Sequence, residues 1–140
     1  MSNFFNLLLS IALLFPSMCL WAMGPDYKCK IERISIASGD SGNLYETYKE
    51  LYLGKEFTVD RRNGVMVGEL KNSYVTRPQV IDFGSTENSY KVVNSLKAEQ
   101  GAGAGSNIYA LNIEEFHSGP KKPFVFLENN KVFFGFCEHY

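Results

Sequence analysis

Few side chains in this chain combine into the constellations that catalysis requires. Its two histidines are His117 and His139. A nucleophile needs a base within hydrogen-bond reach, but His117 opens a Gly/Pro-rich segment and His139 is the penultimate residue, where we expect a mobile chain end. Glu114 and Glu115 are neighbours, so on a strand they point to opposite faces and cannot flank one bond as paired glycosidase carboxylates do. We therefore predict no catalytic residues and a protein that is not an enzyme.

The cysteines favour a disulfide over a metal site. If Cys19 leaves with an N-terminal leader, Cys29 and Cys137 remain, near the two ends of the mature chain. Two cysteines in an exported chain indicate one disulfide, with two free buried thiols as the alternative. Two cysteines and two histidines at such distant positions do not supply a zinc site. We expect no metal and no cofactor.

The N-terminal segment is typical of an export signal. Residues 4–22 carry no charged side chain, and Leu7–Phe15 form an apolar run of the length of a signal-peptide core. Ala22 is a small residue at a plausible cleavage position. An uncleaved membrane anchor and a lipoprotein signal at Cys19 are the alternatives. The sequence predicts a signal peptide at 1–22, one domain at 23–140 with no stable membrane anchor after cleavage, and a periplasmic or extracellular location.

Composition limits the class of the mature part. A chain of 140 residues predicts a single domain, and 45% hydrophobic residues exclude a wholly disordered chain. The formal net charge of −1 gives no electrostatic case for binding nucleic acid.

Most of the mature chain has the pattern of short strands. Residues 27–36 alternate and then slip by one position near Glu32–Arg33, which predicts a β-bulge. Asn63-Gly64 between two alternating runs predicts a hairpin. Residues 44–53 instead repeat apolar side chains at helical spacing, with Asn43 and Glu46 as a capping box and Gly54 as the stop.

The hairpin 124–137 is apolar on both strand faces, so we expect it to be central and covered on both sides. About eight strands joined by short turns predict a mainly β domain, a small antiparallel barrel or sandwich with one short helix after the first strand. A disulfide between the ends would bring the first and last strands together.

Aromatic side chains supply two candidate surfaces. Tyr45, Tyr48 and Tyr52 on the predicted helix, together with Arg61 and Arg62 on a turn, form the candidate interaction surface, because exposed Tyr and Arg are enriched at protein interfaces. Packing of the three tyrosines against the sheet is the alternative. A disulfide-tied interaction protein is expected to carry its function in loops 60–64, 98–107 and 117–123.

Part of the chain resembles known exported proteins. Residues 54–68, 87–92 and 136–138 resemble small exported bacterial proteins without an assigned function. Tyr27-Lys28-Cys29 with a distant second cysteine is similar to the cysteine frame of bacterial lysozyme-inhibitor barrels. The resemblance is one of architecture and implies no site.

Three functions from different classes follow. The first is a small periplasmic or secreted protein-interaction module, of which an inhibitor is one form. The second is a carrier of a small apolar ligand inside a β-barrel. The third is an enzyme with a polar cluster around Asp82, Glu114 or His117. We favour the first, a monomer acting on a protein partner.

Overall fold

The computed structural model describes residues 24, 26–74, 76–103 and 107–140. The predicted signal peptide at 1–22 lies outside the described residues, as does part of the predicted loop 98–107. The predicted mainly β class, with one short helix after the first strand, is confirmed. The elements are β1 (Tyr27–Ile36), α1 (Asn43–Tyr52), β2 (Glu56–Val59), β3 (Met66–Gly68), β4 (Gln79–Phe83), β5 (Tyr90–Leu96), the short 3-10 helix η1 (Ala98–Gln100), β6 (Asn107–Ile113), β7 (Lys122–Glu128) and β8 (Lys131–His139).

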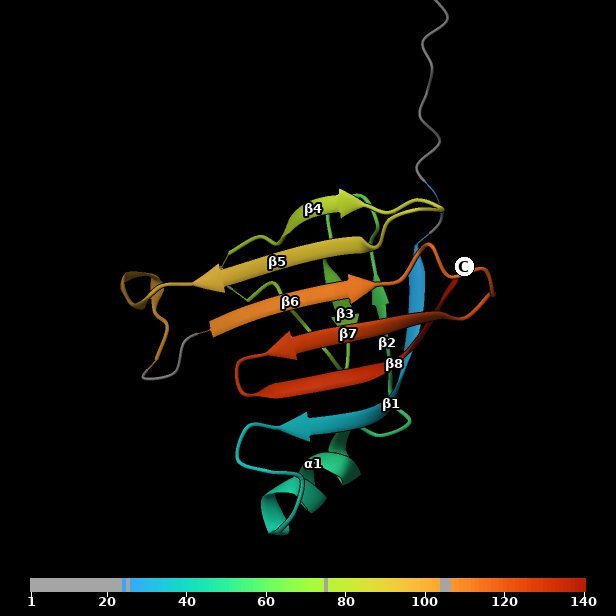
Figure 1. Ribbon diagram of the computed structural model, residues 1–140. Helices are drawn as coiled ribbons and strands as arrows, with labels where there is room; N and C mark the ends of the chain where they lie inside the picture. Colours follow the sequence, from blue (N-terminus) through green and yellow to red (C-terminus); the bar gives the residue numbers. More distant parts are fainter. Residues whose placement is uncertain (1–23, 25, 75, 104–106) are drawn as a thin grey trace, which may run out of the picture.

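The strands form one curled antiparallel sheet. Their order is β3-β2-β1-β8-β7-β6-β5-β4, so β3 and β4 are the two edges. Figure 1 shows the sheet bending so that β2 and β3 lie behind the layer that carries β5 to β8. The fold is therefore a half-barrel rather than a sandwich of two sheets, and the first and last strands are neighbours, as the predicted disulfide requires.

The predicted bulge lies at the bend of β1. The register between β1 and β8 shifts between Ile31 and Arg33, which leaves the extra residue at the position inferred from the slipped apolar pattern. The segment after α1 binds at the same point, because the Gly54 amide donates to the Ile31 carbonyl and the Ile31 amide donates to the Lys55 carbonyl. A bulge increases local strand twist. Here the added twist lets β1 bend while it pairs with β2 on one side and with β8 on the other.

The helix is where the periodicity placed it, but its N-terminus differs. The N-cap is Gly42, which has a φ of 85°, and no side chain caps the helix. The predicted capping box at Asn43 is therefore wrong. Asn43 is already helical, since it is the first residue of α1, and a capping side chain must come from the residue before the first turn.

The concave face of the sheet is filled by large side chains. Six aromatic residues from five strands are less than 2% exposed: Tyr27, Phe57, Tyr90, Phe124, Phe126 and Phe133. Phe57 and Phe124 meet edge to face with ring centroids 5.2 Å apart. An apolar ligand inside the half-barrel would have to displace these rings.

The apolar hairpin is central in the sheet, as predicted, but it is not covered on both sides. The outward side chains Val125 and Phe136 are 38% and 36% exposed. No described element packs over them, because α1 packs against β1. The sequence pattern could not distinguish a strand covered on both faces from a strand with an exposed apolar face.

Gly135 is where β8 approaches β1 most closely. A Cβ atom at this position would meet the Lys30 carbonyl and lie 2.9 Å from the Phe124 ring. Gly135→Ala is expected to lower the free energy of unfolding by about 2 kcal/mol, because overpacking forces the backbone apart. Urea unfolding measures the change. An alanine variant as stable as the wild type would contradict this close approach.

Buried side-chain amides connect the edge strand β3 to the chain that follows it and to β5. The Asn72 amide group donates to the Gly64 carbonyl at 2.8 Å, and its oxygen accepts from the Met66 amide at 3.0 Å. Asn94 of β5 donates to the carbonyls of Asn72 and Thr76. These buried amides satisfy edge groups that would otherwise need water or another chain.

Candidate functional site

Three connections and the chain terminus meet at one end of the half-barrel, which we call the loop end. It consists of the β2–β3 turn (60–65), the β4–β5 turn (84–89), the β6–β7 loop (114–121) and the last residues, 138–140. Loops held by a rigid sheet are where binding residues concentrate. Contacts between all four segments pass through a few side chains.

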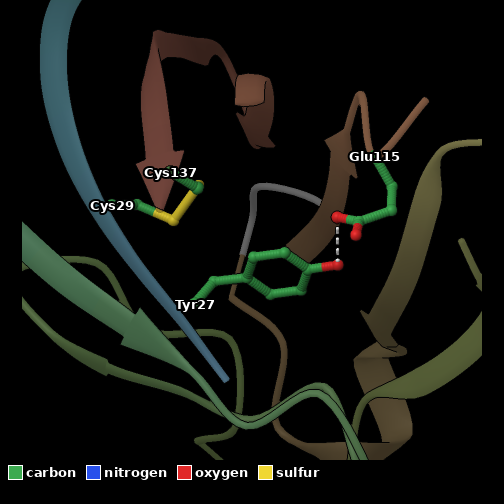
Figure 2. The surroundings of a disulfide bond; sticks show 4 residues. All are labelled: Tyr27, Cys29, Glu115 and Cys137. Carbon is green, nitrogen blue, oxygen red and sulfur yellow. Dashed lines mark hydrogen bonds between the residues drawn. A yellow bond between two sulfur atoms is a disulfide. The ribbon is translucent and has the colours of Figure 1, made fainter. Parts of the chain in front are cut away.

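Glu115 is the centre of these contacts. The Tyr27 hydroxyl donates to its Oε2 at 2.8 Å, and His139 Nε2 lies 2.8 Å from its Oε1. Arg61 Nη1 lies 3.6 Å from the same Oε1. Figure 2 shows the Tyr27 ring extending from β1 toward the carboxylate, beside the Cys29–Cys137 disulfide. One carboxylate thus joins β1, the β2–β3 turn, the β6–β7 loop and the end of β8.

Arg61 extends this contact to the opposite edge of the sheet. Its Nη2 donates to the Phe83 carbonyl at the end of β4 at 2.8 Å, and its backbone amide donates to Asp26 at 2.9 Å. The side chain is only 11% exposed. Because Arg presents several donors in a planar fork, one side chain can bind both the carboxylate of Glu115 and a carbonyl of an edge strand.

Two buried tyrosines form the floor below these charged groups. The ring centroids of Tyr27 and Tyr90 are 5.2 Å apart, and Tyr27 lies 4.8 Å from the ring of His139. Burial, together with the hydrogen bond to Glu115, raises the pKa of Tyr27 far above its ordinary value of 10.0. Burial also raises the pKa of Tyr90. Both phenols therefore act as neutral hydrogen-bond donors.

These raised pKa values predict a loss of stability in alkali. Below pH 10 both phenols are neutral in the folded and unfolded states, so the stability is fully present. Above pH 10 the unfolded chain releases phenol protons that the folded chain still holds. Each buried tyrosine therefore lowers the free energy of unfolding by about 1.4 kcal/mol per pH unit. Urea unfolding between about pH 9 and about pH 11 is expected to show a shallower decline for Tyr27→Phe. Tyr140→Phe, at an exposed position, is the control, and equal slopes for Tyr27→Phe and the wild type would contradict the assignment.

The surface of the loop end carries exposed aromatic side chains and one exposed arginine. Phe83, Phe116 and Tyr140 are 48%, 46% and 65% exposed, and the Arg62 side chain is 71% exposed while it pairs with Asp60. Aromatic side chains and arginine dominate the binding energy of protein interfaces. The largely buried groups beneath, Tyr27, Arg61, Glu115 and His139, contact one another.

The predicted interaction residues fall into two places. Arg61 and Arg62 lie in the loop end, the first buried beneath it and the second exposed on it. Tyr45, Tyr48 and Tyr52 lie on α1 and pack against the core. The Tyr52 ring meets Phe133 edge to face at 4.9 Å, and Tyr45 donates to the Ile34 carbonyl at 3.4 Å.

The predicted disulfide is present. Cys29 and Cys137 are directly opposite each other on β1 and β8, with Cα atoms 3.9 Å apart and 108 residues apart in sequence. A disulfide is compatible with an oxidising, exported location.

Sequence reasoning missed the central residues of the loop end. Tyr27 was considered only as part of the alternating segment 27–36 and of the Tyr27-Lys28-Cys29 frame, and Glu115 only as half of an adjacent pair. His139 was expected to be mobile, which is wrong, because its ring contacts both Tyr27 and Glu115. The available signal was that β1 and β8 must be neighbours if the disulfide forms, which places Tyr27 opposite His139.

The side chains proposed for an enzymatic cluster have separate partners. Asp82 binds the Lys91 ammonium at 3.1 Å on the outer face of the sheet, whereas His117 Nδ1 accepts from the Gly119 amide. Within residues 26–74, 76–103 and 107–140, no side-chain hydrogen bond joins Asp82, Glu114 and His117 to one another.

In the same described part of the chain, no three His, Cys, Asp or Glu side chains are grouped so that they could hold a metal ion. No helix among the described residues is both long and apolar enough to span a membrane.

Comparison with known proteins gives no relative. No family model, no curated protein and no solved structure matches this chain. The candidate site therefore rests on the geometry of the loop end alone.

Proposed function

We propose that this chain is an exported protein-interaction module that binds a protein partner through the loop end. The observation that carries the proposal is the convergence of Tyr27, Arg61 and His139, from three other chain segments, on the buried Glu115 carboxylate. Four exposed side chains lie on these segments or directly beside them: Phe83, Phe116, Tyr140 and Arg62.

The physical advantage of this arrangement is preorganisation. Ordering loops on binding costs free energy, and loops already fixed in the free protein avoid most of that cost. At the loop end the fixing contacts are side-chain hydrogen bonds and an ion pair, so the exposed aromatic rings keep one arrangement. An inhibitor of an exported enzyme is one form that such a module takes.

Capture experiments with matched variants test the surface. The purified disulfide-containing protein is immobilised and exposed to an envelope and secreted-protein extract of the source cells. The double variant Arg62→Ala/Phe116→Ala removes two exposed side chains, and Leu44→Ala, which is 52% exposed on α1, is the control. The proposal expects a protein that is retained by the wild type and the control and lost by at least tenfold with the double variant, the effect of about 1.4 kcal/mol. Equal retention by all three would contradict it.

Export is a separate part of the proposal. It rests on the apolar segment before Ala22 and on the Cys29–Cys137 disulfide. The intact mass of the protein recovered from cells, measured without reduction, is expected to correspond to a chain beginning near residue 23 and lacking two hydrogens. A reduced chain that still begins with Met1 would contradict export.

A further inference from the structure

The exposed face of the central strands has an ordered pattern of side chains. Outward residues lie in rows across the strands, because paired residues in a sheet share a face. One row runs Lys30, Phe136 and Pro123 through β1, β8 and β7. The Glu114 amide donates to the Pro123 carbonyl at 2.8 Å, so Glu114 continues this row on the other side.

In the next two rows the residues on β7 and β8, the two central strands, are also apolar. The second row consists of Arg33, Phe134, Val125 and Asn112. In the third row, Val132 of β8 lies opposite Leu127 of β7. We call the six central side chains the outer patch: Pro123, Val125, Leu127, Val132, Phe134 and Phe136.

The outer patch is a shallow groove with charged groups on both sides. A groove of about 540 Å³ runs over Val125, Phe134 and Phe136. Glu32 and Arg33 line it on the β1 side, and Glu114 lines it on the β6 side. The Arg33 guanidinium lies 3.5 Å above the Phe134 ring, which it covers in part. An apolar centre with a charged rim is the usual composition of a protein interface.

The row that begins at Lys30 and ends at Glu114 would match a second copy of the same row that runs in the opposite direction. A twofold axis parallel to the strands, between β7 and β8, exchanges the two sides of the patch. β8 then faces β7 of the second copy, and β1 faces β6. Phe136 meets Pro123 of the second copy, Phe134 meets Val125, and the Lys30 ammonium meets the Glu114 carboxylate. Isologous dimers require such a self-complementary patch.

We infer that the outer patch binds a second copy of this chain face to face, with Lys30 of each copy paired to Glu114 of the other. The occupant is a second copy because one rotation matches the apolar positions and sets Lys30 of each copy opposite Glu114 of the other. The inference does not depend on the proposed function, since the apolar contact uses the sheet face; Glu114, the first residue of the β6–β7 loop, is the one residue that this contact shares with the loop end.

Sedimentation equilibrium of the disulfide-containing protein tests the inference, from about 1 µM to about 1 mM, a range that covers weak association. The wild type is expected to dimerise within this range. Lys30→Glu and Glu114→Lys are each expected to weaken the dimer by about 100-fold, because each reversal places like charges together at two symmetric positions. The double reversal is expected to restore the dimer to within about threefold of the wild type, because it re-creates both pairs in the opposite order.

An apolar control separates this face from others. Val125→Asp is expected to abolish the dimer, whereas Ile81→Asp, 60% exposed on the edge strand β4, is expected to leave it intact. Thermal unfolding of each variant confirms that its monomer is folded. A wild type that stays monomeric, a dimer that survives Val125→Asp, or a double reversal that stays as weak as the single ones would overturn the inference. The last result, combined with loss of self-association in Val125→Asp, would show that the copies contact each other in another orientation.

Discussion

Replacing Cys29 and Cys137 together with alanine is expected to lower the free energy of unfolding by about 4 kcal/mol. The two residues are separated by 108 positions, so the bond closes a loop that includes nearly every described strand. In the chain-entropy model, a closed loop of about 100 residues contributes roughly 4.7 kcal/mol, and measured values are often lower. Most of the effect comes from the unfolded state, where the bond removes conformations.

Urea unfolding of the oxidised wild type and the double variant measures this difference. The matched control is reductant, which should destabilise the wild type and leave the double variant unchanged. If the double variant does not fold, the shift of the wild-type transition on reduction gives the same quantity. A difference below about 1 kcal/mol would show that the bond adds little to the contacts between β1 and β8, contrary to the expected constraint on the unfolded chain.

Glu115→Ala is expected to cost about 3 kcal/mol, because removing one partner of a buried ion pair leaves the other charge uncompensated. The Glu115 and Arg61 side chains are only 12% and 11% exposed, so solvent screens their interaction weakly. The Tyr27 hydroxyl would also lose its acceptor in a site where its side chain is fully buried. Hydrogen exchange should accelerate mainly in the loop end, since the lost contacts are concentrated there.

The control for Glu115 is Glu87→Ala, an exposed carboxylate of the β4–β5 turn in the same loop end. A surface substitution of this kind is expected to change stability by less than about 0.5 kcal/mol. Tyr27→Phe removes one hydrogen bond to Glu115 and should cost about 1 kcal/mol. Equal effects of Glu115→Ala and Glu87→Ala would mean that the central carboxylate does not hold the loops.

Local patterns predicted most of the fold correctly. Alternation placed the strands, the slip near Glu32 located the bulge, and helical spacing located α1. These features depend on neighbours in sequence, which is why one chain is enough to find them. The predicted N-cap of α1 was wrong because both Asn43 and Gly42 are residue types that suit a helix start. Only the backbone conformation distinguishes them.

The candidate site could not be predicted in the same way. Tyr27, Arg61, Glu115 and His139 come from four distant segments, and their meeting depends on how far the sheet curls. The cysteines implied that the start of β1 and the end of β8 are neighbours, but nothing local indicated that Arg61 would reach Phe83 on the other edge. The exposed outer patch was misread for a related reason, since strand pattern alone does not say what covers a second apolar face.

Site-specific photo-cross-linking in the exporting cell tests the central claim, that the loop end is a docking surface, most directly. A photo-reactive amino acid replaces Phe116 in one strain and Leu44 of α1 in another; the two side chains are 46% and 52% exposed. We predict a discrete adduct with another protein at position 116 that is absent at position 44 and disappears when Glu115→Ala is added. No adduct at 116, or the same adducts at both positions, would contradict the claim.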